Sequence, residues 1–277
     1  MRIPVVRGVI DRRILVNYRV DPRVLAPLLP APFRPQVTHG VGMAGICLIR
    51  LKRVRPAFLP SWLGISSENA AHRIAVEWDE NGMVREGVYV RRRDTNAWLN
   101  VLAGGRLFPG THFHASFLVA ESGDRFSIAL RSDDAVTRMS VRGHRADGLP
   151  ASSIFRSLEE ASAFFQAGSL GYSATHDPSL FQGLELRCRD WRMEPLAVEE
   201  VHSSFFEDSS LFPKGSIEFD CALLMHGIKH EWHGKADLCC AQAVGPNGPL
   251  HQTAGAGVRA RRAVSSALAA GEYHRST

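Results

Sequence analysis

Alternating apolar and polar residues run through most of the chain and predict β-strands separated by turns. An apolar residue at every second position is the pattern of a strand with one buried face. The pair Asn81-Gly82 is typical of a tight hairpin between two such strands. Predicted strands cover 7–20, 37–55, 70–78, 87–93, 113–121, 125–131, 135–142, 170–174, 184–189, 194–206 and 216–232.

Three short segments have the spacing and end signals of helices. Residues 21–30 begin with Asp-Pro and end with proline, which suits a cap, a first helical position and a stop. A second helix is expected over 96–103, before a Gly-Gly pair. Ser157 and Glu160 form a capping box for a third, which Gly168 ends.

The arrangement of these segments indicates the fold class. Strands far outnumber helices and do not alternate with them, which favours an α+β fold built on one curved antiparallel sheet. Glycines at positions 40, 42 and 45 fall inside the predicted 37–55 strand and indicate a bulge or sharp bend there. Such bends would let the sheet curl toward a barrel.

The composition changes after Cys240 to a segment rich in alanine, glycine and arginine. We predict one domain over residues 1–240 and a mobile basic tail over 241–277. Four arginines against one glutamate give the tail three of the five net positive charges of the chain. The remaining body is close to neutral, so the sequence predicts no nucleic-acid partner.

Hydropathy and cysteine usage indicate a cytoplasmic protein with no membrane partner. The longest apolar run, 41–49, is broken by glycines and falls well short of a membrane helix. No apolar signal-peptide region follows the start at Met1. The five cysteines are odd in number and contain no C-x-x-C pair, which argues against a disulfide framework or a zinc knuckle.

Residues 87–117 concentrate the candidate chemistry of the chain. The strand there ends in three arginines, and side-chain alternation predicts that Arg91 and Arg93 share one face while Arg92 lies on the other. The next strand carries His112 and His114 on one face. The stretch therefore brings cations and imidazoles to one end of a sheet, either as a site or as solvated strand-end side chains.

Histidine spacing elsewhere does not predict a metal site. On a strand, His226 and His230 would share a face about 13 Å apart, too far to bind one ion together. His112 and His114 would need a third ligand such as Glu68, and pairs without one are usually structural. No G-x-S-x-G, P-loop or Rossmann motif is present. We therefore predict neither a metal nor a cofactor.

Several segments taken together resemble the DUF2071 family, which is similar to the acetoacetate decarboxylase superfamily. They are Gly-Val-Tyr-Val-Arg-Arg-Arg-Asp-Thr at 87–95, Gly-Arg-Leu-Phe-Pro-Gly-Thr-His at 105–112, the early helix at 21–30, and Ser-Ala-Phe-Phe-Gln-Ala-Gly-Ser-Leu-Gly-Tyr-Ser at 162–173. The resemblance covers roughly residues 6–234. It implies a closed or cone-shaped antiparallel β-barrel of acetoacetate-decarboxylase-like type, with a few short outer helices and a ligand cavity inside.

The resemblance departs from the decarboxylases at the residue that carries their chemistry. There, a Gly-Arg segment leading to Phe-Pro-Lys supplies the lysine that forms a Schiff base with a β-keto acid. Here Phe-Pro is followed by Gly110 and Thr111, and neither can replace an amine. The Phe-Pro-Lys ending at Lys214 lies in a different loop, and Lys229 is expected at the surface.

Three functions remain open from the sequence. A lysine-independent lyase or decarboxylase acting on a keto acid would use Glu68 or His112 as acid or base. A binding module without catalysis would hold a small carboxylate or partly apolar ligand. A structural protein would have a filled barrel. We favour small-molecule binding, with a homo-oligomer possible, and the predicted ligand-binding residues are Arg73, Arg91, Arg106, Trp98 and His114, with Trp62 as a lid candidate.

Overall fold

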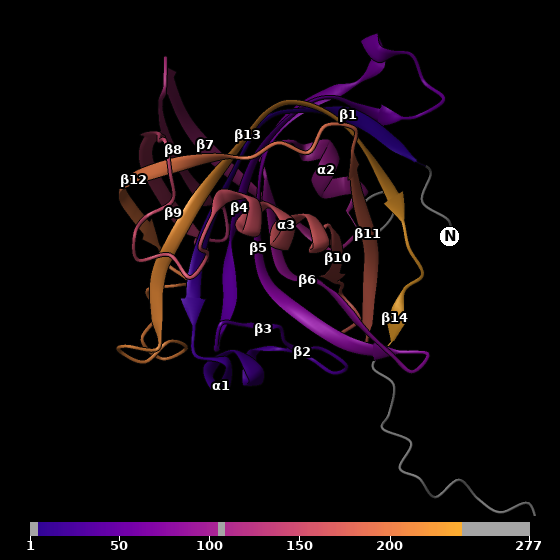
Figure 1. Cartoon of the computed structure of the whole chain (residues 1–277). Helices are drawn as coiled ribbons and strands as arrows, with labels where there is room; N and C mark the ends of the chain where they lie inside the picture. Colours follow the sequence, from indigo (N-terminus) through magenta and orange to yellow (C-terminus); the bar gives the residue numbers. More distant parts are fainter. Residues whose placement is uncertain (1–4, 105–108, 240–277) are drawn as a thin grey trace, which may run out of the picture. The chain divides into compact units, whose positions relative to one another are not determined.

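The computed structural model describes residues 5–104 and 109–239, and this part of the chain is mostly β-strand (Figure 1). The strands are β1 (Val6–Val20), β2 (Arg34–Pro35), β3 (Val37–Thr38), β4 (Val41–Pro56), β5 (Ile65–Glu80), β6 (Met83–Thr95), β7 (His112–Ser122), β8 (Arg125–Ser132), β9 (Arg138–Arg145), β10 (Leu170–Ala174), β11 (Leu180–Cys188), β12 (Glu194–Ser203), β13 (Ile217–Gly234) and β14 (Leu238–Cys239). The helices are α1 (Pro22–Leu25), α2 (Trp98–Ala103) and α3 (Leu158–Ala167), with the 3-10 turns η1 (Ala26–Leu28) and η2 (Ser61–Leu63). The predicted tail, 241–277, lies outside the described residues.

The described strands form one sheet that closes on itself. Its order is β14-β11-β10-β6-β7-β8-β9-β12-β13-β1-β4-β5-β2, and β11 also pairs with β13 while β6 also pairs with β5. Strands β1, β4, β5, β6, β10, β11 and β13 therefore close in a ring. Most pairs are antiparallel, and β6 runs parallel to β10 and β7. The predicted α+β fold with a curved, mainly antiparallel sheet and few short helices is confirmed.

The wall made by β4, β1 and β13 has a hydrophobic core on each face. Ile14 and Val16 of β1 pack into one core with residues of β8 and β9. Leu15, between them in the sequence, packs into the second core, inside the ring, because successive side chains point to opposite faces. Helix α3 contributes Ala161 and Phe165 to this second core. The ring therefore has a mainly apolar interior that α3 helps to fill.

Helix α3 begins where the capping box predicts. Ser157 Oγ accepts a hydrogen bond from the backbone N–H of Glu160 at 3.2 Å. Glu160 Oε2 accepts from the backbone N–H of Arg156 at 2.7 Å, one residue before the N-cap. Both bonds satisfy backbone donors at the start of the helix, which fixes the α3 entry point at the ring.

Irregularities in the strands decide which side chains face the ring interior. On β6, Val90 pairs with Arg73 and Arg92 pairs with His72, so Arg91 is an extra, bulged residue. As a result Arg93 lines the same cavity as Val90, whereas Arg91 is exposed. The prediction that Arg91 and Arg93 share a face is wrong, because the bulge interrupts the alternation.

Strand β13 contains a similar interruption at Gly227, which has a φ of 69°. Met225 and Ile228 both belong to the core inside the ring, although strict alternation would place them on opposite faces. His226 is exposed and His230 is buried. The predicted shared face of these two histidines is therefore wrong, since glycine permits the left-handed conformation that shifts the facing.

The segment predicted as one strand over 37–55 is a hairpin followed by a long strand. His39 and Gly40 have φ values of 51° and 84° and form the turn between β3 and β4. Within β4, the register shift opposite β5 falls between Leu51 and Val54, away from the glycines. In the described residues, none of the helices has the length and hydropathy required to cross a bilayer.

Candidate functional site

A cavity of about 140 Å³ lies inside the ring of strands. It is smaller than the roughly 300–1,000 Å³ of sites for drug-sized ligands, so it suits a ligand of few heavy atoms. Much of its lining is apolar and comes from Cys47, Ile49, Leu51, Val54, Val88, Val90, Leu184, Leu186 and Trp232. Its polar lining includes Arg13, Ser67, Asn69, Arg73, Arg93, Asp94, Asn100 and His112.

Arg13 and Arg73 reach this cavity from β1 and β5, which both pair with β4. Arg13 Nε donates to Cys47 Sγ at 3.3 Å. Arg73 Nη2 donates to Asn17 Oδ1 at 2.6 Å, and its guanidinium lies 5.0 Å from the ring centroid of Phe165. Its Nε is buried without a hydrogen-bond partner in the described part of the chain. These partners are neutral, so the charges are left uncompensated.

Arg93 enters from β6 and also contacts only a neutral group. Its Nε and Nη2 donate to Ser173 Oγ at 3.1 and 2.8 Å. Burial lowers the pKa of Arg73 and of Arg93 to about 10, so both remain cationic at neutral pH. Among the described residues, no carboxylate forms an ion pair with Arg13, Arg73 or Arg93. The cavity therefore holds three guanidinium groups without carboxylate partners in the described part of the chain. Its lining also contains Asp94, whose carboxylate pairs with Arg92.

Neutral hydrogen-bonding groups form one end of the cavity, where α2 meets β5. Asn69 Nδ2 donates to Ser67 Oγ at 2.9 Å. Asn100 Nδ2 lies 3.1 Å from Thr95 Oγ1 and 3.3 Å from Asn69 Oδ1, and donates to both. Because these side chains hold one another in place, this end offers oriented polar groups to a ligand.

His112 lies in the cavity wall as a neutral imidazole. Burial, with a smaller contribution from the charge of Arg93, lowers its pKa to about 3. Nδ1 lies 3.1 Å from the carbonyl oxygen of Gly110, so a proton on Nδ1 is donated to that oxygen. The other nitrogen, Nε2, is then unprotonated at neutral pH and can accept a hydrogen bond.

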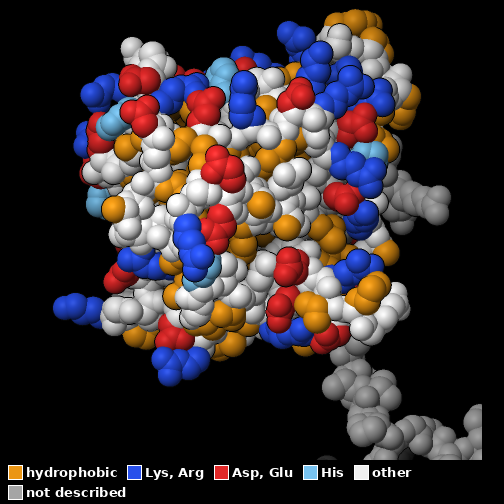
Figure 2. All heavy atoms as spheres, in the orientation of Figure 1, with side chains coloured by type: hydrophobic (Ala, Val, Ile, Leu, Met, Phe, Trp, Pro, Cys, Tyr) orange, Lys and Arg blue, Asp and Glu red, His pale blue; other side chains and the backbone are white. Residues whose placement is uncertain are grey.

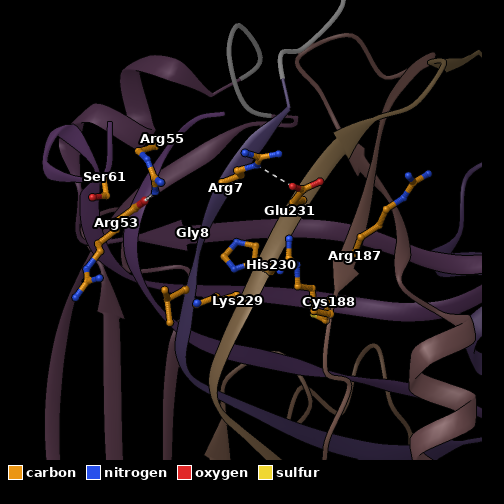
Figure 3. A pocket seen from close by; sticks show the side chains of 12 residues that line it. Arg7, Gly8, Arg53, Arg55, Ser61, Arg187, Cys188, Lys229, His230 and Glu231 are labelled. Carbon is orange, nitrogen blue, oxygen red and sulfur yellow. Dashed lines mark hydrogen bonds and ion pairs between the residues drawn. The ribbon is translucent and has the colours of Figure 1, made fainter. Parts of the chain in front are cut away.

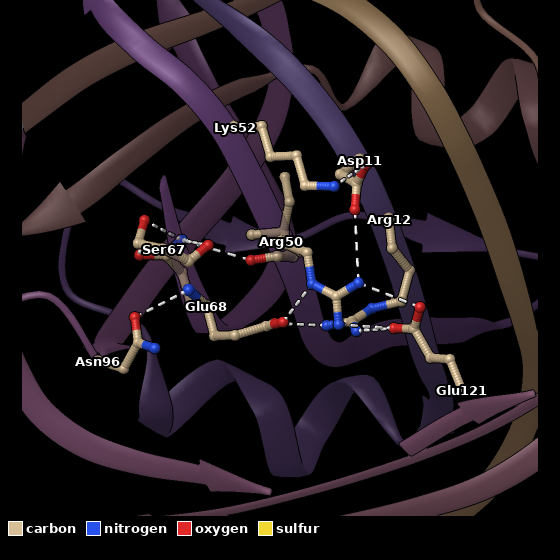
Figure 4. A network of polar contacts seen from close by, with 10 residues as sticks. Asp11, Arg12, Arg50, Lys52, Ser67, Glu68, Asn96 and Glu121 are labelled. Carbon is tan, nitrogen blue, oxygen red and sulfur yellow. Dashed lines mark hydrogen bonds and ion pairs between the residues drawn. The ribbon is translucent and has the colours of Figure 1, made fainter. Parts of the chain in front are cut away.

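Glu68, the other predicted acid or base, belongs to an ion-pair network and does not line the cavity (Figure 4). Its Oε2 lies 2.5 Å from Arg12 Nη2, and its Oε1 lies 2.6 Å from Arg50 Nε. Glu121 pairs with the same two arginines, and Asp11 pairs with Arg50 and Lys52. This network compensates Arg12, which is completely buried.

Three of the predicted ligand-binding residues lie elsewhere. Arg91 is exposed, with its guanidinium 5.4 Å from the ring centroid of Phe205. His114 stacks on the exposed Trp98 at a centroid distance of 4.1 Å, and its Nδ1 lies 2.8 Å from Asp133. Arg106 lies outside the described residues. Of the predicted set, Arg73 and His112 line the cavity.

The four lysines of the chain are all described and all exposed: Lys52, Lys214, Lys229 and Lys235. None of them lines the cavity. At the sequence position where the resemblance would place the decarboxylase lysine, Gly110 has a φ of 79°. A Cβ on Gly110 would lie 2.5 Å from Ser173 Cβ, so a side chain there would require β10 to move.

Metal-ligating residues are not gathered at the cavity. In the described ranges, no three His, Cys, Asp or Glu side chains are placed to share one ion. The described cysteines are free thiols, of which Cys47 and Cys221 are buried. The polar groups that line the cavity are therefore guanidinium, amide, hydroxyl and imidazole groups, together with the carboxylate of Asp94.

Sequence reasoning missed two of the three cavity arginines, Arg13 and Arg93. The arginine run at 91–93 was a useful signal, but the bulge at Arg91 determines which member points inward. Arg13 is one of two adjacent arginines on β1, and no sequence pattern distinguishes it from Arg12. The polar end formed by Ser67, Asn69 and Asn100 carries no motif.

Solved structures with the same architecture are acetoacetate-decarboxylase-like proteins. An acetoacetate decarboxylase-like enzyme from Sphingomonas wittichii RW1 has a TM-score of 0.52 at 13% identity, over 86% of this chain and 93% of that one. Acetoacetate decarboxylase from Legionella pneumophila has a TM-score of 0.52 at 15% identity, over 84% and 87%. The enduracididine biosynthesis enzyme MppR, complexed with pyruvate, has a TM-score of 0.54 at 11% identity, over 87% and 91%. The fold is therefore of the acetoacetate-decarboxylase-like class.

Within this class, the chain belongs to the DUF2071 family, described as an uncharacterized conserved protein. The family model matches residues 10–222, which contain the ring strands β4, β5, β6, β10 and β11 completely, β1 from Ile10 onward and the first part of β13. No curated protein matches the chain.

Proposed function

We propose that the protein binds a small organic anion, a carboxylate with a short apolar part, in the cavity inside the ring of strands. The observation that carries this proposal is the set of three guanidinium groups without carboxylate partners in the described part of the chain. Burying an unpaired charge is unfavourable, and a bound anion would offset that cost.

The lining suggests how the two parts of such a ligand are held. Arg73 and Arg93 offer forked N–H donors that match a carboxylate, and Arg13 adds a third positive charge. The apolar side chains of β4, β6 and β11 would contact the hydrocarbon part. MppR, which shares the fold, is complexed with pyruvate, a carboxylate of the size that this cavity would take.

A second candidate function is lysine-independent decarboxylation of a keto acid. The three cavity arginines favour it, because guanidinium groups would stabilise the enolate that remains after CO₂ leaves. The candidate general base favours binding without catalysis. The pKa of His112 is about 3, which makes this imidazole a weak base at neutral pH. Release of CO₂ from acetoacetate by the purified protein, abolished in Arg93→Gln, would support the catalytic alternative.

A calorimetric titration tests the class of ligand. The wild-type protein is titrated with acetate, butyrate, pyruvate and acetoacetate, and in parallel with acetamide and butyramide, which match in shape and lack the charge. Carboxylates should bind at least about tenfold more tightly than the matched amides, since a charge-assisted hydrogen bond contributes roughly 1.5–3 kcal/mol. Equal affinities within each pair, or no binding by any carboxylate, would contradict the proposal.

The proposal that the protein acts without a Schiff base has its own test. The protein is incubated with acetoacetate, reduced with borohydride and weighed intact by mass spectrometry. Because none of the lysines lines the cavity, we expect no adduct at stoichiometric yield. An adduct mapped to Lys214, Lys229 or Lys235 would show that an amine does act in this protein.

A further inference from the structure

A second, larger cavity of about 550 Å³ lies where the start of β1, the end of β4 and the end of β11 meet β13 (Figure 3). Figure 3 shows Arg53 and Arg55 on one side of it, Arg187 on the other and His230 between them. Six cations line this basic cavity: Arg7, Arg53, Arg55, Arg187, Arg189 and Lys229. Glu231 is the acidic residue in its lining.

The charges of this cavity are far from balanced. Arg7 pairs with Glu231, and Arg187 pairs with Glu185. Arg55 donates to the backbone carbonyls of Leu59 and Arg53. In the described part of the chain, no ion pair with a carboxylate is formed by Arg53, Arg55, Arg189 or Lys229. The whole chain has a formal net charge of only +5, so this is a local concentration of positive charge.

Two features indicate that the basic cavity is more than a solvated surface. Arg53 adopts a φ of 55°, an uncommon conformation for a residue with a side chain, and strained positions of this kind cluster at functional sites. His230 lies in the lining and is only 3% exposed, and neither ring nitrogen has a hydrogen-bond partner in the described part of the chain. A buried polar group without a partner points to a missing ligand or water.

An apolar tip adjoins the cations. The loop after β4 contributes Ser61 to the cavity lining and carries Phe58 and Trp62, each 78% exposed. Figure 2 shows this tip as an apolar cap beside a group of Lys and Arg side chains. A ligand that bears both an anionic group and a flat or apolar group would match the two parts of the surface.

We propose that the basic cavity is a second binding site, separate from the cavity inside the ring, and that it recognises the phosphate groups of a soluble phosphorylated molecule. Guanidinium groups bind phosphate oxygens through paired N–H donors, and several of them suit a di- or triphosphate better than a single phosphate. Phe58 and Trp62, exposed on the loop that contributes Ser61 to the lining, would contact an attached ring or chain. A phosphate could also come from a lipid headgroup, and the experiment below distinguishes the two sources.

Calorimetric titration with inorganic pyrophosphate, with inorganic phosphate as the weaker probe, tests this site in the full-length protein. Pyrophosphate should bind more tightly than phosphate, with an affinity that falls as NaCl is raised. The double variant Arg53→Glu/Arg189→Glu should bind pyrophosphate at least about tenfold more weakly. The matched control, Arg131→Glu/Arg138→Glu on β8 and β9, changes the net charge equally at exposed positions outside the cavity and should bind like wild type.

Circular dichroism of each variant confirms folding, and the milder Arg189→Gln replaces the double variant if that does not fold. Co-sedimentation with vesicles of phosphatidylcholine alone, and of phosphatidylcholine and phosphatidylserine in equal parts, tests the lipid source. Binding to the mixed vesicles without binding to pyrophosphate would overturn the assignment of a soluble ligand. Equal loss of pyrophosphate binding in the control pair, or no binding of wild type to either pyrophosphate or the mixed vesicles, would overturn the site itself.

Discussion

Two arginines that are adjacent in the sequence have opposite electrostatic surroundings. Arg12 is completely buried and bonds to the carboxylates of Glu68 and Glu121. Arg13, on the other face of β1, donates to the thiol sulfur of Cys47 and lines the cavity inside the ring. The first charge is compensated within the protein and the second is not. At the scale of single residues, the candidate site is the place where cavity-lining arginines have no carboxylate partner among the described residues.

The network around Arg12 gives a prediction for Glu68. Glu68→Gln should lower the free energy of unfolding by about 1.5–3 kcal/mol, because it removes a charged partner from two arginines. Urea denaturation measures this loss, and Glu86→Gln, at an exposed position on β6, serves as the matched control. Carboxylate binding should persist in Glu68→Gln. Unchanged stability together with lost binding would instead give Glu68 a direct role at the site.

The same pair of arginines shows how far residue-level prediction could reach. Arg73 and His112 were identified as candidates, and both line the cavity. Arg13 could not be distinguished from Arg12, because a carboxylate partner 56 or 109 residues away is invisible in the local sequence. Glu68 is a carboxylic acid and Arg91 a cation, as the predicted roles require. Contacts that form only in the folded sheet direct both side chains away from the cavity.

At the scale of elements, bulges and turns place the site. The extra residue at Arg91 on β6 turns Arg93 into the ring interior, and Gly227 on β13 separates His226 from His230. Strands and their approximate bounds could be predicted from alternation, since it reflects which side chains are buried. A bulge is a single-residue event that alternation does not record, so the facing of residues beyond it could not be predicted.

Helix α3 gives a prediction at this scale. Phe165 is 3% exposed and packs inside the ring beneath the guanidinium of Arg73. Phe165→Ala should lower the free energy of unfolding by about 3–5 kcal/mol and weaken carboxylate binding, because Arg73 loses its support. Thermal or urea unfolding measures the first effect. Phe58→Ala, at a position 78% exposed, should leave stability nearly unchanged, and an equal loss in the two variants would contradict the role given to α3.

At the scale of the whole molecule, closure of the sheet is what creates an interior. The number and type of strands indicated an α+β fold, but two pairs that close the ring, β11 with β13 and β6 with β10, join segments far apart in the sequence. The resemblance to the DUF2071 family predicted a closed barrel, whereas the alternation of apolar and polar residues alone could not predict closure. Closure also brings buried histidines into an environment that disfavours their charge.

The buried histidines predict how stability depends on pH. Burial lowers the pKa of His72 and of His112 to about 3 and that of His230 to about 4, from an ordinary value of 6.5. Between these values the unfolded chain binds more protons than the folded one, so stability falls as the pH is lowered through this window. Below its unfolded pKa, each such histidine lowers the free energy of unfolding by about 1.4 kcal/mol for every unit by which the pH falls.

Urea denaturation at a series of pH values checks this dependence. The free energy of unfolding should decrease steadily from about pH 6.5 to about pH 4.5. His72→Phe should give a shallower slope, because His72 is buried beside Phe205 and its ring nitrogens lack hydrogen-bond partners among the described residues. A flat profile over this range, or an unchanged slope in His72→Phe, would contradict the protonation states assigned to the folded protein.

The central claim is that unpaired arginines inside the ring bind a carboxylate, and neighbouring residues of β6 allow a direct test. Arg93 lines the cavity and Arg91 is exposed, so Arg93→Gln and Arg91→Gln make the same chemical change at different sites. The measurement is the dissociation constant of the tightest-binding carboxylate for wild type and both variants by calorimetry. The account predicts a loss of about tenfold to a hundredfold in Arg93→Gln and less than about twofold in Arg91→Gln. Equal affinities in the two variants would contradict it.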